Sequence, residues 1–170
     1  MPKTPTPQTI PGLQHLLDTL PQTGQIDWIG LRPAREAPMQ VVNNVLAQPG
    51  TGLVGDRYAG RSRGKRQVTL IQAEHIPVIA SCAHLSELTP EMLRRNIVVS
   101  GINLLALKNR QFYAGHALLE YTGPCDPCSK MERDLGPGAY NAMRGHGGIT
   151  ARVLAEGEIA VGGEVKLAIS

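Results

Sequence analysis

The chain has 170 residues, which is enough for one domain with a sizeable hydrophobic core. A net charge of only +3 and an aromatic content of 4% argue against a nucleic-acid-binding protein, which would need a basic surface and stacking side chains. Three cysteines are an odd number, which argues against a disulfide framework. Since the sequence shows no membrane-spanning apolar run and no signal-peptide core, we expect a cytoplasmic protein without a membrane partner.

The N-terminal region predicts an arm, a helix and two strands. Four prolines within residues 1–11 predict a flexible N-terminal arm, followed by one domain over residues 12–170. Leucines at helical spacing predict a short helix over Gly12–Leu20. Apolar and β-branched residues then predict strands over Ile26–Leu31 and Met39–Leu46.

Residues 50–66 predict a long basic loop with five glycines and four arginines. Backbone N–H groups can approach an anion closely at glycines, and arginine adds forked hydrogen-bond donors. The loop is therefore a candidate anion site, although a solvated surface loop explains the same composition equally well.

Short strands alternate with short helices in the rest of the chain. We expect a helix over Ala73–Ala83, another beginning at Pro90 after the N-cap Thr89, and a helical turn over Gly138–Met143. The expected strands are Gln67–Ile71, Ile97–Val99, one or two within Phe112–Tyr121, Ile149–Leu154, Glu158–Val161 and Glu164–Ile169. This pattern has no regular βαβ rhythm and predicts a mainly β fold with α insertions, a β-barrel.

The segment Cys125-Asp-Pro-Cys128 precedes a short helix with clear boundary signals. Asp126 is a favourable N-cap, Pro127 suits the first helical position, and Gly136 is a typical helix end. This interpretation places Cys128 in the first helical turn, beside unpaired backbone N–H groups, where a thiol ionises more readily than a free one.

The CxxC spacing leaves several roles open for the two cysteines. A thioredoxin-like dithiol normally follows a strand in a βαβ unit, and a zinc site needs a second pair of ligands. The third active role is a single thiolate that acts as nucleophile, sulfur carrier or ligand of a soft metal. The structural alternative is a pair of packed thiols.

Three further residues are candidates for a site. His146 lies between glycines downstream of the cysteines, where it could contact a ligand or serve as an ordinary turn residue. Arg94 and Asn96 lie where a helix leads into a strand. They suit either a helix C-terminus or a second set of donors for the anion suggested by the basic loop.

Taken together, these motifs resemble the MOSC domain, the family named for the C-terminal domain of molybdenum cofactor sulfurases. The matching segments follow the family's order between residues 26 and 168, and they are Gly52–Arg57, Arg66–Gln72, Leu93–Leu104, the Cys128 segment, Gly148–Leu154 and Ile159–Gly162. The resemblance is closest to small, stand-alone bacterial members and implies a MOSC-type β-barrel.

The resemblance also implies a cofactor and a set of site residues. Family members bind the molybdenum cofactor, a molybdopterin with a dithiolene and a terminal phosphate. Cys128 matches the cysteine that carries sulfur or ligates molybdenum. The candidate cofactor-binding residues are Arg57, Arg66, Arg94, Asn96 and His146. Pyridoxal phosphate is linked to the family through a separate desulfurase domain, for which this chain has neither room nor a Schiff-base lysine motif, so we do not expect it here.

The resemblance allows two activities and leaves two alternatives. The activities are reduction of N-hydroxylated compounds and sulfur transfer, each with an external electron-donor or sulfur-donor protein. The first alternative is a non-catalytic carrier of the molybdenum cofactor. The second is a metal-free redox protein that uses Cys125 and Cys128 as a dithiol.

Overall fold

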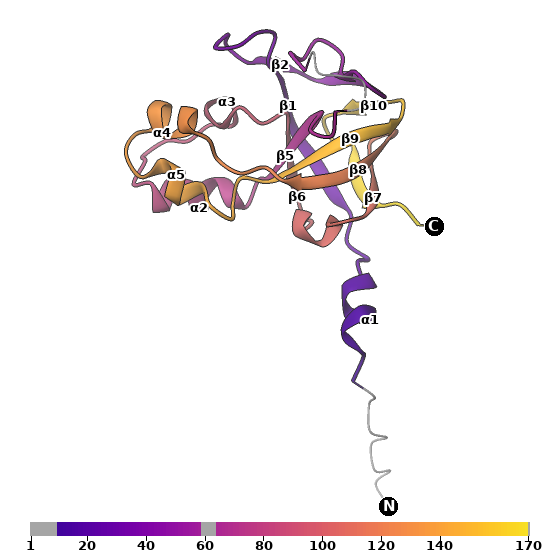
Figure 1. The fold of residues 1–170 in the computed structure, drawn as a ribbon. Coiled ribbons are helices and arrows are strands. Elements are labelled where there is room, and N and C mark those ends of the chain that lie inside the picture. The colour runs from indigo at the N-terminus through magenta and orange to yellow at the C-terminus, as the bar shows by residue number, and fades with distance from the viewer. Residues whose placement is uncertain (1–9, 59–63, 170) are drawn as a thin grey trace, which may run out of the picture.

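The structure is a computed structural model that describes residues 10–58 and 64–169 (Figure 1). Residues 1–9, 59–63 and 170 lie outside the described residues, and with them most of the predicted N-terminal arm and the middle of the predicted basic loop. Among the described residues, no helix has both the length and the apolar character needed to cross a lipid bilayer.

Within the described residues, seven strands close into a mixed β-barrel, which confirms the predicted fold class. Their order around the barrel is β11 (Glu164–Leu167), β7 (Gln111–Ala114), β8 (Ala117–Pro124), β9 (Ile149–Ala155), β5 (Val68–Gln72), β6 (Ile97–Ser100) and β1 (Gly24–Leu31). Antiparallel pairing of β1 with β11 closes the ring, and the short β2 (Gln40–Val42) pairs with the far end of β1. Phe112, Ile26 and Leu119 are fully buried in its core.

A small second sheet contains β10 (Gly157–Ala160), β3 (Asn44–Gln48) and β4 (Gly52–Leu53). The single strand predicted over Met39–Leu46 is therefore wrong, because the chain bends at Asn43 and its two halves pair with different partners. The carbonyl of Asn43 accepts a hydrogen bond from the backbone N–H of Val161 at 2.8 Å, which holds the bend.

Strands β5 and β6 are the parallel pair in the described part of the barrel, and α2 (His75–Cys82) and α3 (Pro90–Leu93) connect them. Both faces of these strands are buried. Leu70 and Ile97 pack inside the barrel, whereas Ile71 and Val98 pack against the helices. This two-sided burial explains the near-continuous apolar sequences of β5 and β6.

The helical layer consists of α2, α3, α4 (Ser129–Leu135) and α5 (Ala139–Met143), which lie together beside the barrel at the left of Figure 1. Its core includes Ile79, Leu93, Met131 and Met143, all of which are almost completely buried. Helix α3 begins as predicted, with Thr89 as the N-cap and Pro90 as the first helical residue. A short 3-10 helix, η1 (Leu104–Leu107), follows β6.

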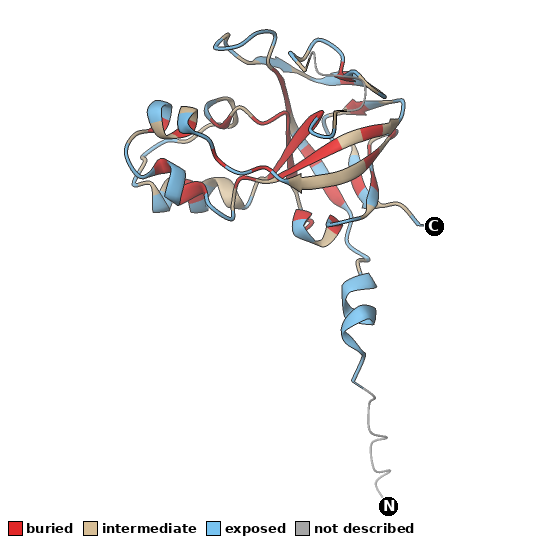
Figure 2. Cartoon of the chain, in the orientation of Figure 1, coloured by how far each residue is buried: buried red, intermediate tan, exposed pale blue. Residues whose placement is uncertain are grey.

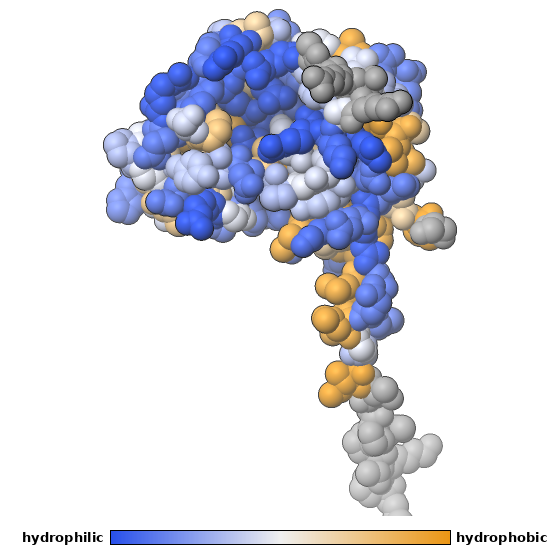
Figure 3. Space-filling model, in the orientation of Figure 1, coloured by the Kyte–Doolittle hydropathy of each residue, from blue (hydrophilic) through white to orange (hydrophobic). Residues whose placement is uncertain are grey.

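Helix α1 (Leu13–Asp18) projects away from the barrel, and none of its residues is buried (Figure 2). Its leucines form an apolar strip along one side of the helix (Figure 3). The base of the helix is held by Arg110, which donates to the Asp18 carboxylate and to the carbonyl of Leu17. The predicted helix is thus confirmed as a local element that packs on nothing else among the described residues.

Candidate functional site

Helix α4 begins two residues later than the sequence predicted, and Cys128 is its N-cap. The backbone of Cys128 is extended, with φ −129° and ψ 171°, and its carbonyl accepts a hydrogen bond from Met131 N at 2.9 Å. The reason lies in the preceding strand: Pro124 is in register with Ile149, and Cys125 N donates to Gly148 O at 2.8 Å. This β8–β9 pairing continues to Cys125 and keeps the chain extended, so the helix cannot begin at Asp126.

The two cysteines of the motif lie in different environments. The Cys128 thiol is exposed and lines a cavity of about 610 Å³, which we call the cationic cavity. Cys125 is only 6% exposed and lines a different cavity of about 430 Å³, which we call the second cavity. Both thiols are free, as is Cys82.

The cationic cavity brings together basic side chains from separate parts of the chain. Among the described residues, its lining includes the seven cations Arg32, Arg35, Arg57, Arg94, Arg95, Lys130 and Arg133. Glu36 is the one carboxylate of this lining, and Cys128 is its thiol. Arg32 is next to the end of β1, Arg94 and Arg95 precede β6, and Lys130 and Arg133 lie on α4, so closure of the barrel and docking of α4 assemble the site.

An exposed ion-pair network forms one rim of the cationic cavity. The Glu36 carboxylate accepts from Lys130 Nζ at 2.8 Å and from Arg133 Nη2 at 2.9 Å. Lys130 and Arg133 also bond to Asp134, at 2.6 and 2.8 Å respectively. Hydrogen bonds from Arg133 and Lys130 lower the pKa of Asp134 to about 2, and the bond from Lys130 lowers that of Glu36. This rim ties the loop after β1 to α4.

A buried network fixes Arg32 from behind the cavity wall. The fully buried Asp56 side chain accepts from Arg32 N at 2.7 Å and from Arg32 Nη2 at 2.9 Å. Asn96, which is 0% exposed, donates to Asp56 at 3.1 Å and to Gly30 O at 3.1 Å, while its Oδ1 accepts from Thr69 N at 3.1 Å. The amide of Asn96 is therefore used inside the protein, where it supports Arg32.

The structure places the predicted cofactor-binding residues in three kinds of position. Arg57 and Arg94 line the cationic cavity with Cys128. Asn96 lies behind the wall, as just described. Arg66 is exposed and is not among the described residues that line the cavity. The His146 ring instead contacts His75 edge to face, with ring centroids 4.9 Å apart.

His146 also has an unusual polar atom. Its Nδ1 is buried and has no hydrogen-bond partner among the described residues. The structure therefore brings together Cys128, Arg57 and Arg94 from the predicted set, and it leaves Arg66 and His146 outside the lining of this cavity.

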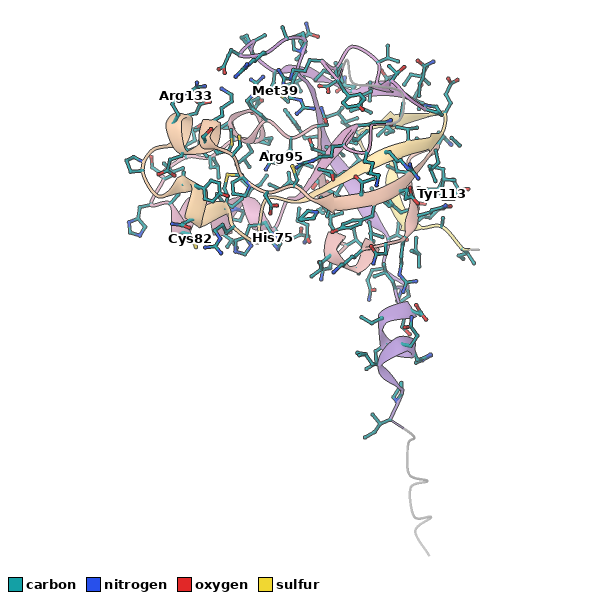
Figure 4. All side chains as sticks on the ribbon, viewed as in Figure 1. Met39, His75, Cys82, Arg95, Tyr113 and Arg133 are labelled. Atoms are coloured by element: carbon teal, nitrogen blue, oxygen red, sulfur yellow. The ribbon has the colours of Figure 1, made fainter. Side chains whose placement is uncertain are left out.

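Arg95, which lies between the candidates Arg94 and Asn96 in the sequence, also lines the cationic cavity. Its guanidinium, in a residue 7% exposed, donates to Gly147 O at 2.8 Å, Leu93 O at 3.0 Å and Cys125 O at 3.2 Å. Gly147 permits this approach, because a Cβ atom there would lie 2.2 Å from Cys125 O. Figure 4 shows Arg95 between the helical layer and the barrel, where it links the cysteine segment to the start of β6.

The sequence patterns did not predict four other cations of the cavity lining, namely Arg32, Arg35, Lys130 and Arg133. The available signal was local: Arg32 and Arg35 directly follow a clear strand, and Lys130 and Arg133 are three residues apart on the helix that follows Cys128. Residues at that spacing share one helix face. Clustered arginine next to a candidate thiol could therefore have pointed to these residues.

Comparison with known proteins identifies the family. Residues 45–166 match the family model of the MOSC domain. No curated protein matches the chain in sequence. Among solved structures, the YuaD protein from Bacillus subtilis is similar with a TM-score of 0.74 and 20% identity, covering 86% of this chain and 96% of that one.

YiiM proteins from two bacteria have a similar fold. The match to YiiM from Escherichia coli has a TM-score of 0.66 and 18% identity and covers 86% of this chain and 70% of that one. The match to YiiM from Geobacillus stearothermophilus has a TM-score of 0.65 and 19% identity, with coverages of 86% and 75%. Since the family match spans more than half of the 170 residues, this chain belongs to the MOSC domain family, a family associated with binding of the molybdenum cofactor.

Proposed function

We propose that this protein binds the molybdenum cofactor in the cationic cavity, with the Cys128 thiolate as its ligand to the metal or as its sulfur-carrying group. One observation carries the proposal: an exposed thiol lies in the wall of a cavity that also has seven cationic side chains and a single carboxylate among its described lining residues. A thiolate is a suitable ligand for a soft metal, and arginine is well suited to a phosphate.

The donor set fits such a cofactor. A metal whose remaining ligands come from an organic dithiolene needs one ligand from the protein, which Cys128 supplies. Arg35 and Arg57 have guanidinium groups without a hydrogen-bond or ion-pair partner among the described residues, so their donors are available for a phosphate. Arg94 uses Nη1 to donate to Ala37 O at 2.8 Å and retains its other donors.

Each part of the chain has a defined task in this proposal. Bound molybdenum cofactor supplies oxidation–reduction chemistry at its metal. Cys128 holds the reacting centre at the N-cap of α4, while Arg35, Arg57 and Arg94 bind the terminal phosphate and so orient the cofactor. The activity is reduction of N-hydroxylated compounds or sulfur transfer, with an external protein that donates electrons or sulfur. A cofactor carrier without turnover would use the same residues.

Two other assignments are less well supported. A redox-active CxxC dithiol needs both thiols to be accessible at the same site. Cys125 is instead buried and lines the second cavity, whereas Cys128 is exposed in the cationic cavity. Pyridoxal phosphate needs a lysine that loses its proton, but hydrogen bonds to Asp134 and Glu36 raise the pKa of Lys130, the lysine of the cationic cavity.

Metal and pterin analysis tests the proposal. The wild-type chain, Cys128→Ser and Cys125→Ser are produced in a host that makes the cofactor, and bound molybdenum and pterin are measured per chain. We expect Cys128→Ser to lose molybdenum by at least about tenfold, because loss of even a group that hydrogen-bonds to a metal ligand weakens metal binding by about 10- to 100-fold. Cys125→Ser should retain the metal. Wild-type protein without molybdenum and pterin would contradict the proposal, and equal losses in both variants would favour the dithiol.

A turnover assay separates the enzyme from the carrier. Cofactor-loaded protein is mixed with an N-hydroxylated purine and reduced methyl viologen as electron donor, and the loss of the N-hydroxyl group is followed. Reduction that disappears in Cys128→Ser supports the reductase. Full loading without turnover, in this assay and in a persulfide-transfer assay, supports the carrier.

A further inference from the structure

The second cavity is a separate feature that the proposed cofactor site does not use. It has a volume of about 430 Å³ and lies where β5 and β8 end and β9 begins, at Gln72, Pro124 and Ile149. Figure 4 shows His75, from its lining, on the lower side of the helical layer, whereas Arg133 of the cationic cavity lies on the upper side. Arg95 lies between the two cavities, because it lines the first and donates to carbonyls of Cys125 and Gly147 in the second.

Apolar side chains form much of the wall of the second cavity. Leu104 and Ile149 are 1% and 4% exposed and contribute to its inner wall, while Leu105 is 65% exposed. When an apolar ligand covers an exposed leucine at the edge of a cavity, apolar surface is removed from water and the free energy of the complex is lowered. Both the volume and the mixture of apolar walls with a few polar groups are typical of small-molecule sites.

The polar groups of this cavity include donors and acceptors that the protein leaves available. The Asn103 side-chain oxygen accepts from Leu105 N at 3.1 Å, whereas its amide nitrogen has no hydrogen-bond partner among the described residues. The same holds for the Tyr121 hydroxyl and the Asp126 carboxylate. Gln72 has a structural task, since its Oε1 accepts from Leu104 N at 3.0 Å and so positions η1.

The charge of the second cavity is opposite to that of the cationic cavity. No lysine or arginine is among its described lining residues, and Asp126 contributes a carboxylate. Burial, together with repulsion from His146, lowers the pKa of His75, which favours the neutral form of its ring. An anionic ligand would therefore meet no lysine or arginine among the described lining residues, whereas an uncharged or cationic ligand would meet the Asp126 carboxylate as an acceptor.

We propose that the second cavity is a binding site for a small organic molecule that is uncharged or singly cationic, with a ring-sized apolar body and N–H donors. The apolar body lies against Leu104, Leu105 and Ile149, and the donors face Asp126. This site is independent of the cofactor proposal, because none of these residues lines the cationic cavity.

Three probes of one shape and different charge test this proposal. Benzamide is neutral, benzamidine is cationic and benzoate is anionic, and each is titrated into the full-length, cofactor-free chain while backbone amide signals are followed by NMR. We expect benzamide and benzamidine to shift the signals of Leu105, Cys125 and Ile149 with dissociation constants of roughly 1–10 mM, as is reasonable for ligands of this size. Benzoate should shift these signals at least about tenfold more weakly, given its repulsion by Asp126.

Two substitutions with a matched control locate the site. Asp126→Asn should weaken benzamidine but not benzamide, because only the cationic probe is attracted by the Asp126 carboxylate. Leu105→Ser should weaken both by about threefold or more through lost apolar contact. Leu17→Ser, which changes an exposed leucine on α1, should change neither. The proposal is overturned if benzamide and benzamidine produce no saturable shifts, if benzoate binds equally well at these residues, or if Leu105→Ser behaves like Leu17→Ser.

Discussion

The cationic cavity and the second cavity lie at the two ends of one four-residue motif, with Cys128 in the first and Cys125 in the second. Among the described residues, seven lysine and arginine side chains line the first cavity and none lines the second. The change occurs across Arg95, whose guanidinium is directed at backbone carbonyls rather than at a carboxylate. A CxxC motif can thus have its two cysteines in two cavities with different charged linings, so that sequence spacing alone does not make these cysteines partners.

The largest expected difference between the cavities is in thiol reactivity. In a Cys82→Ser background, a variant that retains only Cys128 should react with iodoacetamide about 100-fold faster than one that retains only Cys125, because alkylation of a buried thiol requires local opening. Mass spectrometry over time measures both rates under native conditions. Equal alkylation rates in the folded state would remove the basis for assigning the two cysteines to different cavities. Denatured samples serve as the control, because both thiols should then react with iodoacetamide at similar rates.

Substitution of Arg95 tests the wall between the cavities. Arg95→Met should lower the free energy of unfolding by about 2–4 kcal/mol, because three buried carbonyl groups lose charge-assisted hydrogen bonds. Urea unfolding measures this loss, with Arg144→Met at an exposed position as the matched control. Stability equal to that of the control would show that Arg95 does not hold the two cavities apart.

Substitution of Asn96 tests whether this residue supports the wall of the cationic cavity or contacts the ligand directly. Asn96→Ala should cost roughly 1–3 kcal/mol of stability, since Asp56 and Thr69 N lose a partner inside the protein. Thermal or urea unfolding provides the measurement, and the exposed Asn141→Ala provides the comparison. A variant with unchanged stability but weakened cofactor retention would instead support the direct contact predicted from the sequence.

Substitution of Arg57 should change ligand binding but not stability, the reverse of what we expect for Asn96. Arg57→Ala should weaken binding of inorganic phosphate to the cationic cavity by about fivefold while leaving stability unchanged, because the guanidinium has no partner to lose among the described residues. Benzamide binding should also stay unchanged. Lys108→Ala removes the same charge at an exposed position outside the cavity lining, so equal effects of both variants on phosphate binding would indicate only general electrostatics.

The smallest effect concerns the ion-pair rim of the cationic cavity. Hydrogen bonds from Arg133 and Lys130 lower the pKa of Asp134 from 3.8 to about 2. A carboxylate with a lowered pKa stabilises the fold above its unfolded-state value, and this contribution decreases below a pH of about 4 and is lost as pH falls through about 2. Asp134→Asn should therefore be slightly less stable than wild type at pH 6 and should approach wild-type stability only as pH falls below about 2, with added salt shrinking the difference. A difference that is independent of pH would contradict this account.

Local signals and non-local contacts contributed differently to what could be predicted. Strands with strong β-formers, such as Ile26–Leu31 and Ile97–Val99, and the capped start of α3 at Pro90 were predictable because short-range physics decides them. The start of α4 was not, because pairing of β8 with β9 holds Cys125 extended against a favourable N-cap at Asp126. Tertiary contact thus overrode a local preference at the most informative helix of the chain.

The sequence by itself determined the mainly β class and the MOSC family resemblance, and it made Cys128 a candidate, since alternating apolar residues and ordered motifs are properties of the chain alone. Only the tertiary structure decided which candidates line the same cavity. Arg32, Arg57, Arg94 and Cys128 come from distant segments, and barrel closure with docking of α4 brings them together. Asn96 carries the same kind of polar signal as Arg94 two residues earlier, yet it points into a buried network. The physical reason is that residue type sets what a side chain can bind, whereas strand register and packing set what it faces.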